Sequence, residues 1–173
     1  MVGDVMKNKP TIALKNIKHS EFASEETHCY QATLYVDGEK FATVSNDGYG
    51  GSDDVHPFSK NYRDVQELEE RIAATFPKWG SSFGGSDDMD TTLEIVCGDL
   101  VNQWLKRKDF KKAMRRVSYI KQGVEGVYQC PAKFKPSPDM IAAIKEKAAW
   151  AKGCTFLNEL PEAEAMSLYF ANA

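Results

Sequence analysis

The sequence of 173 residues lacks the features that mark several classes of protein. It contains no uninterrupted run of about 18 apolar residues, so it predicts no membrane-spanning helix. Its N-terminus has no apolar signal core, and its four cysteines form no CxxC pair of the kind found in zinc and redox sites. These absences favour a cytoplasmic protein with free thiols at Cys29, Cys97, Cys130 and Cys154.

Catalytic motifs are also missing. The nucleophile pattern GxSxG, the metalloprotease pattern HExxH and the phosphate-binding pattern GxxxxGKS/T do not occur. The three histidines, His19, His28 and His56, lie in the first third of the chain. His28 and Cys29 do not form a dyad, because neighbours on a strand point to opposite faces. The sequence therefore identifies no catalytic residue and favours a binding protein over an enzyme.

Alternating apolar and polar residues predict strands in the first third of the chain. The runs 30–36 and 40–45 alternate with period two, and the Asp37-Gly38 pair between them is typical of a type I′ hairpin turn. A weaker strand pattern begins at Thr11 and then loses its alternation. Residues 46–57 are rich in glycine and aspartate and are expected to be irregular.

Apolar residues spaced three and four apart predict helices in the rest of the chain. The stripe is most regular in a helix expected to start at Asp90 or Thr91 and to end near Lys108. Other predicted elements are helices over 63–76, 139–152 and 162–171, a hairpin over 117–130 and a short strand at 155–157.

This order predicts an α+β fold, in which an N-terminal three-stranded antiparallel meander and a later hairpin pack against about four helices. Residues 1–10 are expected to form a flexible N-terminus. Residues 11–173 are expected to form a single compact domain, or two lobes that meet near 102–109.

Charge is distributed unevenly along the chain. The net charge of −3 combines −8 over residues 1–98 with +5 over the remaining 75 residues. Such asymmetry predicts a basic face for an anionic partner, although an ordinary solvated surface is the alternative. The candidates, expected between a helix and a hairpin, are Lys106, Arg107, Lys108, Lys111, Lys112, Arg115 and Arg116, with Tyr119 as a stacking face for single-stranded nucleic acid.

The acidic half contains two Gly-Gly-Ser-Asp-Asp stretches, at 50–54 and 84–88. Their carboxylates are hard oxygen ligands that suit a divalent cation or a nucleotide–metal complex, but the EF-hand ligand order is absent. The alternative is that the glycines satisfy the backbone and that Ser and Asp cap helices. An acidic face could also imitate nucleic acid in a partner's basic groove. The candidate residues are Asn46, Asp47, Tyr49, Asp53, Asp54, His56, Asp87 and Asp88.

Four phrases resemble uncharacterised proteins of tailed phages and prophages. They are SEET at 24–27, ATLYVDG at 32–38, VSNDGYGG at 44–51 and FLNELP at 156–161. The resemblance implies a small phage product that acts in the host cytoplasm, and it carries over no catalytic residue.

We therefore predict a non-enzymatic protein that binds a host protein or protein–nucleic-acid complex, such as an inhibitor of a host defence system. One alternative is a metal- or nucleotide-binding protein that uses loop 46–56. The other is an accessory protein that binds single-stranded nucleic acid.

Overall fold

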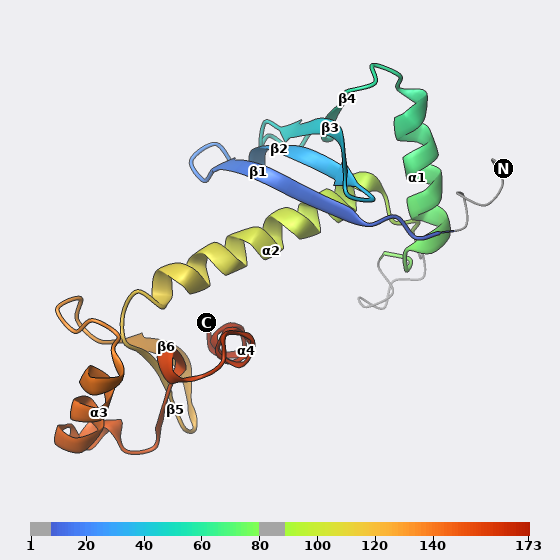
Figure 1. Cartoon of the computed structure of the whole chain (residues 1–173). Helices are drawn as coiled ribbons and strands as arrows, with labels where there is room; N and C mark the ends of the chain where they lie inside the picture. The colour runs from blue at the N-terminus through green and yellow to red at the C-terminus, as the bar shows by residue number, and fades with distance from the viewer. Residues whose placement is uncertain (1–7, 80–88) are drawn as a thin grey trace. The chain divides into compact units, whose positions relative to one another are not determined.

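A computed structural model describes residues 8–79 and 89–173. Within these residues the chain combines two antiparallel sheets with four α-helices, which confirms the predicted α+β class (Figure 1). The chain divides into two compact units, residues 1–103 and 104–173, which are described separately below. No helix in the described part of the chain is long and apolar enough to cross a membrane.

The first unit contains an antiparallel meander. Its strands β1 (Ile12–Ser20), β2 (Cys29–Val36), β3 (Glu39–Asn46) and β4 (Asp54–Pro57) lie side by side in chain order. The β2–β3 turn has φ values of 52° at Asp37 and 88° at Gly38, as the predicted type I′ turn requires.

The meander has one strand more than predicted. The expectation that residues 46–57 are irregular is wrong at their C-terminal end, where Ser45 pairs with Asp54 and Ala42 with Pro57. A proline is tolerated there because β4 is an edge strand and one side of its backbone needs no partner. The weak pattern of β1 also has a structural cause. Its register shifts between Lys15 and Lys18, which reverses the alternation of its side chains.

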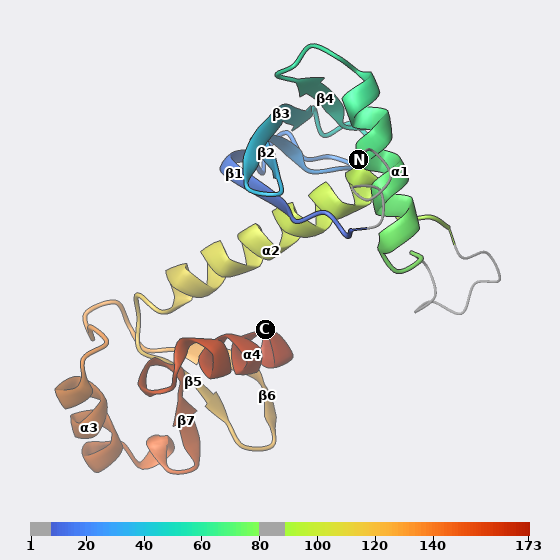
Figure 2. The same ribbon diagram turned by 45° about the vertical axis from the view of Figure 1, so that its right-hand side comes forward.

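One face of the meander forms the core of the first unit. Tyr30, Ala32, Leu34 and Val36 are all buried on β2, as their period-two spacing predicts. They share this core with helix α1 (Arg63–Thr75) and with the first half of helix α2 (Leu93–Ala113), both of which lie beside the sheet in Figures 1 and 2. The buried side chains of these helices are Leu68, Ile72, Leu93, Val96, Cys97 and Val101.

Helix α2 starts later and ends later than predicted. Thr92 caps its start by accepting a hydrogen bond from the Ile95 amide at 3.3 Å, whereas the hydroxyl of Thr91 donates to the Pro77 carbonyl. The predicted end near Lys108 is wrong because the helix continues to Ala113. The last buried residues of α2 are Phe110 and Ala113, and they do not continue the apolar stripe of its first half. The sequence pattern therefore looks as if the helix ended before them.

The second unit surrounds a small antiparallel sheet. Strands β5 (Ser118–Lys121), β6 (Val124–Gln129) and β7 (Cys154–Phe156) have the order β6-β5-β7, so the predicted hairpin gains a third strand. Helix α3 (Pro138–Lys147) is shorter than predicted, because the chain leaves the helix at Ala148 and forms a short 3-10 turn at Ala149–Ala151.

The chain then enters a second 3-10 turn, η4 (Leu157–Glu159), before the last helix, α4 (Glu162–Asn172). The C-terminal part of α2, η4 and α4 share one apolar cluster, whose buried members are Phe110, Leu157 and Ala165. The end of α2 is therefore held against two consecutive segments that lie more than 40 residues later in the sequence.

Candidate functional site

The predicted basic residues lie along the C-terminal turns of α2 and in the turn that follows it. The expectation that they lie between a helix and a hairpin is therefore corrected, because the helix itself carries most of them. All seven side chains are exposed, and none forms an ion pair with another described residue. They are called the basic end of α2 below and comprise Lys106, Arg107, Lys108, Lys111, Lys112, Arg115 and Arg116.

The basic end of α2 concentrates positive charge that has no ion-pair partner among the described residues. Two of its ammonium groups lie over aromatic rings, Lys106 at 5.8 Å from the centroid of Phe170 and Lys108 at 5.1 Å from that of Trp104. Lys108 and Lys111 are three residues apart and lie on one side of the helix, and Arg115 follows in the turn after it. Like charges at this spacing cost about 0.2–0.5 kcal/mol per pair, and the negative end of the helix dipole offsets part of that cost. An anionic partner would remove the remaining repulsion.

Asn158 fixes the chain where α2 ends. Its side-chain amide donates to the carbonyls of Met114 at 3.1 Å and Arg116 at 3.0 Å, and its Oδ1 accepts from the Ser118 amide at 2.7 Å. These bonds satisfy backbone groups of the turn that follows α2 and of Ser118, the first residue of β5. No motif in the sequence marks Asn158 as a structural residue, apart from its place within the FLNELP phrase.

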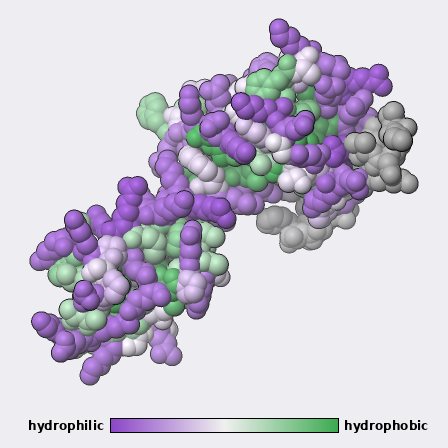
Figure 3. Space-filling model, viewed as in Figure 1, coloured by the Kyte–Doolittle hydropathy of each residue, from purple (hydrophilic) through white to green (hydrophobic). Residues whose placement is uncertain are grey.

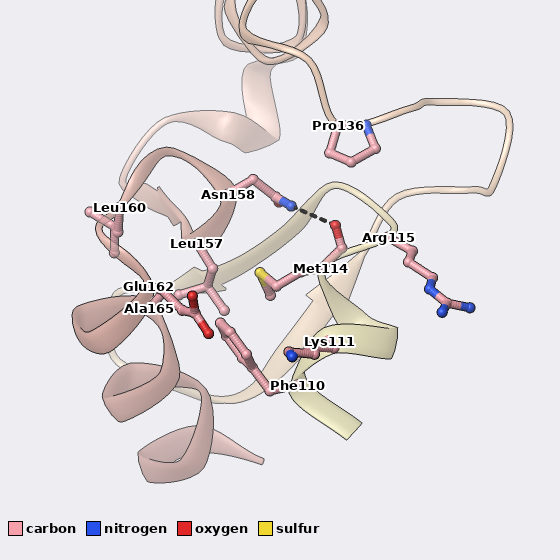
Figure 4. A pocket seen from close by; sticks show the side chains of 10 residues that line it. All are labelled: Phe110, Lys111, Met114, Arg115, Pro136, Leu157, Asn158, Leu160, Glu162 and Ala165. Atoms are coloured by element: carbon pink, nitrogen blue, oxygen red, sulfur yellow. Dashed lines mark hydrogen bonds between the residues drawn. The ribbon is translucent and has the colours of Figure 1, made fainter. Parts of the chain in front are cut away.

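A pocket of about 450 Å³ opens beside the basic end of α2 (Figure 4). Its walls come from the end of α2, from η4 and from the start of α4, all within the second unit. On the face viewed in Figure 3, hydrophobic residues of the second unit reach the surface among hydrophilic ones. The lining residues are Phe110, Lys111, Met114, Arg115, Pro136, Leu157, Asn158, Leu160, Glu162 and Ala165.

Tyr119 does not belong to this surface. It is only 9% exposed, and its ring centroid lies 4.7 Å from that of Trp150 and 5.6 Å from those of Tyr128 and Phe156. Burial also raises the pKa of its hydroxyl. The prediction of Tyr119 as a free stacking face for nucleic acid is therefore corrected: its ring belongs to the core of the second unit.

The glycine-rich loop between β3 and β4 is organised around Asn46, which is buried. Its Oδ1 accepts from the hydroxyl of Thr27 at 2.7 Å and from the amide of Gly48 at 2.9 Å. Its side-chain amide donates to the carbonyl of Gly51 at 2.9 Å and to Asp53 at 3.0 Å. Asn46 therefore acts as a structural hub, with its donors and acceptor used inside the loop.

The carbonyl of Gly48 joins this loop to the β1–β2 loop. It accepts hydrogen bonds from the amides of Glu25, Glu26 and Thr27 at 3.1, 2.9 and 3.2 Å. Gly48 has a φ of 92°, and a Cβ built there would lie 2.0 Å from the carbonyl oxygen of Ala23. Glycine is required at this position by both conformation and space.

Two ionisable side chains beside the loop, Tyr30 and Cys97, are buried and protonated. Tyr30 donates a 2.5 Å hydrogen bond to Asp53. Burial is the largest cause that raises the pKa of the tyrosine hydroxyl, and this hydrogen bond is the second. Burial and the negative charge of Asp53 raise the pKa of the Cys97 thiol to about 12. Cys97 therefore stays a neutral thiol at physiological pH and is a poor nucleophile.

The other predicted loop residues are spread over the surface. Asp47, Tyr49 and Asp54 are exposed, and the exposed His56 lies with its Nδ1 3.2 Å from the hydroxyl of Tyr62. Among the described residues, no group of three or more His, Cys, Asp or Glu side chains is arranged to hold a metal ion. The candidates Asp87 and Asp88, with the second Gly-Gly-Ser-Asp-Asp stretch, lie outside the described residues.

Comparisons with protein family models, curated proteins and solved structures found no match to this chain. Of the two candidate surfaces, the basic end of α2 combines unpaired charge with a neighbouring pocket, whereas the polar groups of the glycine-rich loop largely bond one another.

Proposed function

We propose that this chain is a non-enzymatic binding protein that captures an acidic macromolecule through the basic end of α2. The observation that supports the proposal most directly is the exposure of seven Lys and Arg side chains without an ion pair among the described residues. Such a surface increases the association rate with anionic partners and selects against cationic ones.

The partner we propose is a protein surface. The pocket beside the basic residues has an apolar floor that a phosphate backbone does not match, and Tyr119 is unavailable for stacking on a base. On the resemblance to phage proteins, the proposed partner is a host macromolecule such as a component of a defence system.

Charge reversal in two sets of four residues tests this function. The test variant replaces four residues of the basic end of α2 by glutamate: Lys111, Lys112, Arg115 and Arg116. The control makes the same change in charge at exposed lysines of the second unit that do not line the pocket: Lys133, Lys135, Lys147 and Lys152. Both variants should be checked for retained folding by circular dichroism.

Tagged forms of the wild type and of both variants are incubated with a bacterial lysate, and bound proteins are identified by mass spectrometry. We expect the wild type and the control to recover the same partner and the test variant to lose it. Recovery should also fall with added salt, because exposed charges are screened beyond roughly 8–10 Å. Equal recovery by the two variants would show that the basic end of α2 is not the binding surface.

A binding experiment with nucleic acid distinguishes the proposed protein partner from the alternative of a nucleic-acid partner. Fluorescence anisotropy with a labelled single-stranded oligonucleotide should give weak binding at physiological salt. Tight binding that the test variant abolishes, with a steep dependence on salt, would replace the protein partner with nucleic acid.

A further inference from the structure

The pocket beside the basic end of α2 has a floor made of the unit's own core. Phe110 is 4% exposed, Leu157 is 1% and Ala165 is 2%, and the partly buried Met114 and Leu160 pack against them. Their outer surfaces line the pocket, so its shape is set by side chains that packing already holds in place. The floor of the pocket is therefore fixed by the packing of the core.

The volume of the pocket suits a side chain of a partner. At about 450 Å³ it lies in the range of roughly 300–1,000 Å³ that is usual for ligand pockets. A leucine or an aromatic side chain with its adjoining backbone fits this space. Burying such a group against an apolar floor supplies affinity that surface charge alone does not.

The polar groups around the pocket determine the charge of the occupant. Both side-chain N–H groups of Asn158 already donate to backbone carbonyls, and its oxygen accepts a backbone amide. The remaining donors are Lys111 and Arg115, which are exposed, have no ion pair among the described residues and offer no acceptor. An occupant that meets Lys111 and Arg115 must therefore bring acceptors, and carboxylates satisfy both the hydrogen bonding and the charge there.

The pocket is also polarised. In Figure 4 the Glu162 carboxylate and the Arg115 guanidinium lie on opposite sides of Met114. A carboxylate of the ligand is repelled near Glu162 and attracted near Arg115. The positive charge continues outside the pocket at Lys112 and Arg116, so it extends further than a small ligand reaches.

From this geometry, and resting on the proposed function, we infer that the pocket binds one large apolar side chain of an acidic polypeptide segment. The apolar side chain fills the space over Phe110 and Leu157, and the flanking acidic residues contact Lys111 and Arg115. The partner's recognition element is thus a short segment in which Asp or Glu residues flank a leucine or an aromatic residue.

Labelled peptides test this inference on the wild-type chain. The first probe has one leucine flanked by several Asp and Glu residues, and the second replaces that leucine by alanine. Fluorescence anisotropy should show that the leucine probe binds about tenfold more tightly, the effect of one buried apolar side chain. A third probe with the leucine but with Gln and Asn in place of the acids should bind at least tenfold more weakly than the first.

A matched pair of substitutions in α4 tests the site. Ala165→Leu fills the pocket from its floor, whereas Ala163→Leu adds the same atoms at an exposed position of the same helix. We expect A165L to reduce the leucine probe to the affinity of the alanine probe and A163L to leave the preference unchanged. If A165L fails to fold, the comparison of the three probes on the wild type still decides the question.

The outcomes separate this inference from the proposed function. If the leucine and alanine probes bind equally and the four-residue reversal abolishes both, the acidic partner stands and the pocket inference is overturned. The inference is also overturned if no probe binds. In that case capture of a lysate partner by the wild type, lost in the reversal variant, would still support the proposed function.

Discussion

Replacing Gly48 by alanine is expected to be one of the most damaging small substitutions in the first unit. The residue has a φ of 92°, and a Cβ there would lie 2.0 Å from the Ala23 carbonyl oxygen and 2.9 Å from the Cβ of Cys29. Both neighbours belong to the segment that leads into β2, so the backbone of one loop must move. That movement breaks contacts on which the glycine-rich loop depends.

The magnitude can be built from two contributions. A non-glycine residue in the left-handed region costs about 1–2 kcal/mol. Displacing the β1–β2 loop also weakens the three amide hydrogen bonds to the Gly48 carbonyl, each with a net value of about 0.5–1.5 kcal/mol. Together these contributions predict that G48A loses about 3–5 kcal/mol of unfolding free energy.

Gly38 is the matched control, because it has a similar φ of 88° but nothing within 4 Å of a Cβ built there. G38A should therefore lose only the conformational contribution of about 1–2 kcal/mol. Urea unfolding followed by circular dichroism measures both variants, with the slope m compared to confirm a common transition. If G48A and G38A lose the same free energy, the close approach to Ala23 is not a constraint and the reasoning is refuted.

Three further predictions concern other parts of the chain. N158A should lose about 2–3 kcal/mol of stability in urea unfolding, because three hydrogen bonds at the end of α2 disappear, and a loss under 0.5 kcal/mol would contradict that role. The hydrogen bond from the Thr11 amide lowers the pKa of Asp37. The ionised Asp37 carboxylate therefore stabilises the folded state at pH values above the ordinary pKa of 3.8, and this stabilisation is lost as the pH falls through the lowered folded-state pKa. D37N should accordingly be less stable than the wild type at pH 7, and the difference should shrink in acid. Because the pKa of Cys97 is raised to about 12, iodoacetamide at pH 8 should label the half-buried Cys29 and Cys154 before Cys97, which should react only after unfolding, as mass spectrometry of the digested protein would show.

The α+β class and most of the elements follow from local patterns in the sequence. The β2–β3 hairpin, α1 and α4 are each encoded by residues close together in the chain, through a period of two or of 3.6 and a turn or a proline at the boundary. Edge strand β4 was missed because its evidence is non-local. It forms by pairing with β3 across a glycine-rich loop whose composition is typical of irregular structure.

The candidate site was likewise only partly predictable from the sequence. The concentration of Lys and Arg between positions 106 and 116 is visible in the sequence because charge needs no partner to be counted. The sequence did not show that Tyr119 is buried, that Asn158 closes the end of α2 or that an apolar pocket opens beside it. Each of these facts requires contacts between segments about 30 or more residues apart.

The sequence by itself therefore determined the fold class, the main hairpin and the separation of acidic from basic residues, because all three are properties of neighbouring residues. The tertiary structure decided which of those residues can meet a partner. It turned Asn46 and Tyr119 from candidate ligand contacts into internal packing, and it joined the ends of α2, η4 and α4 around a pocket. The physical reason is that burial and hydrogen-bond saturation depend on long-range contacts, which local periodicity does not specify.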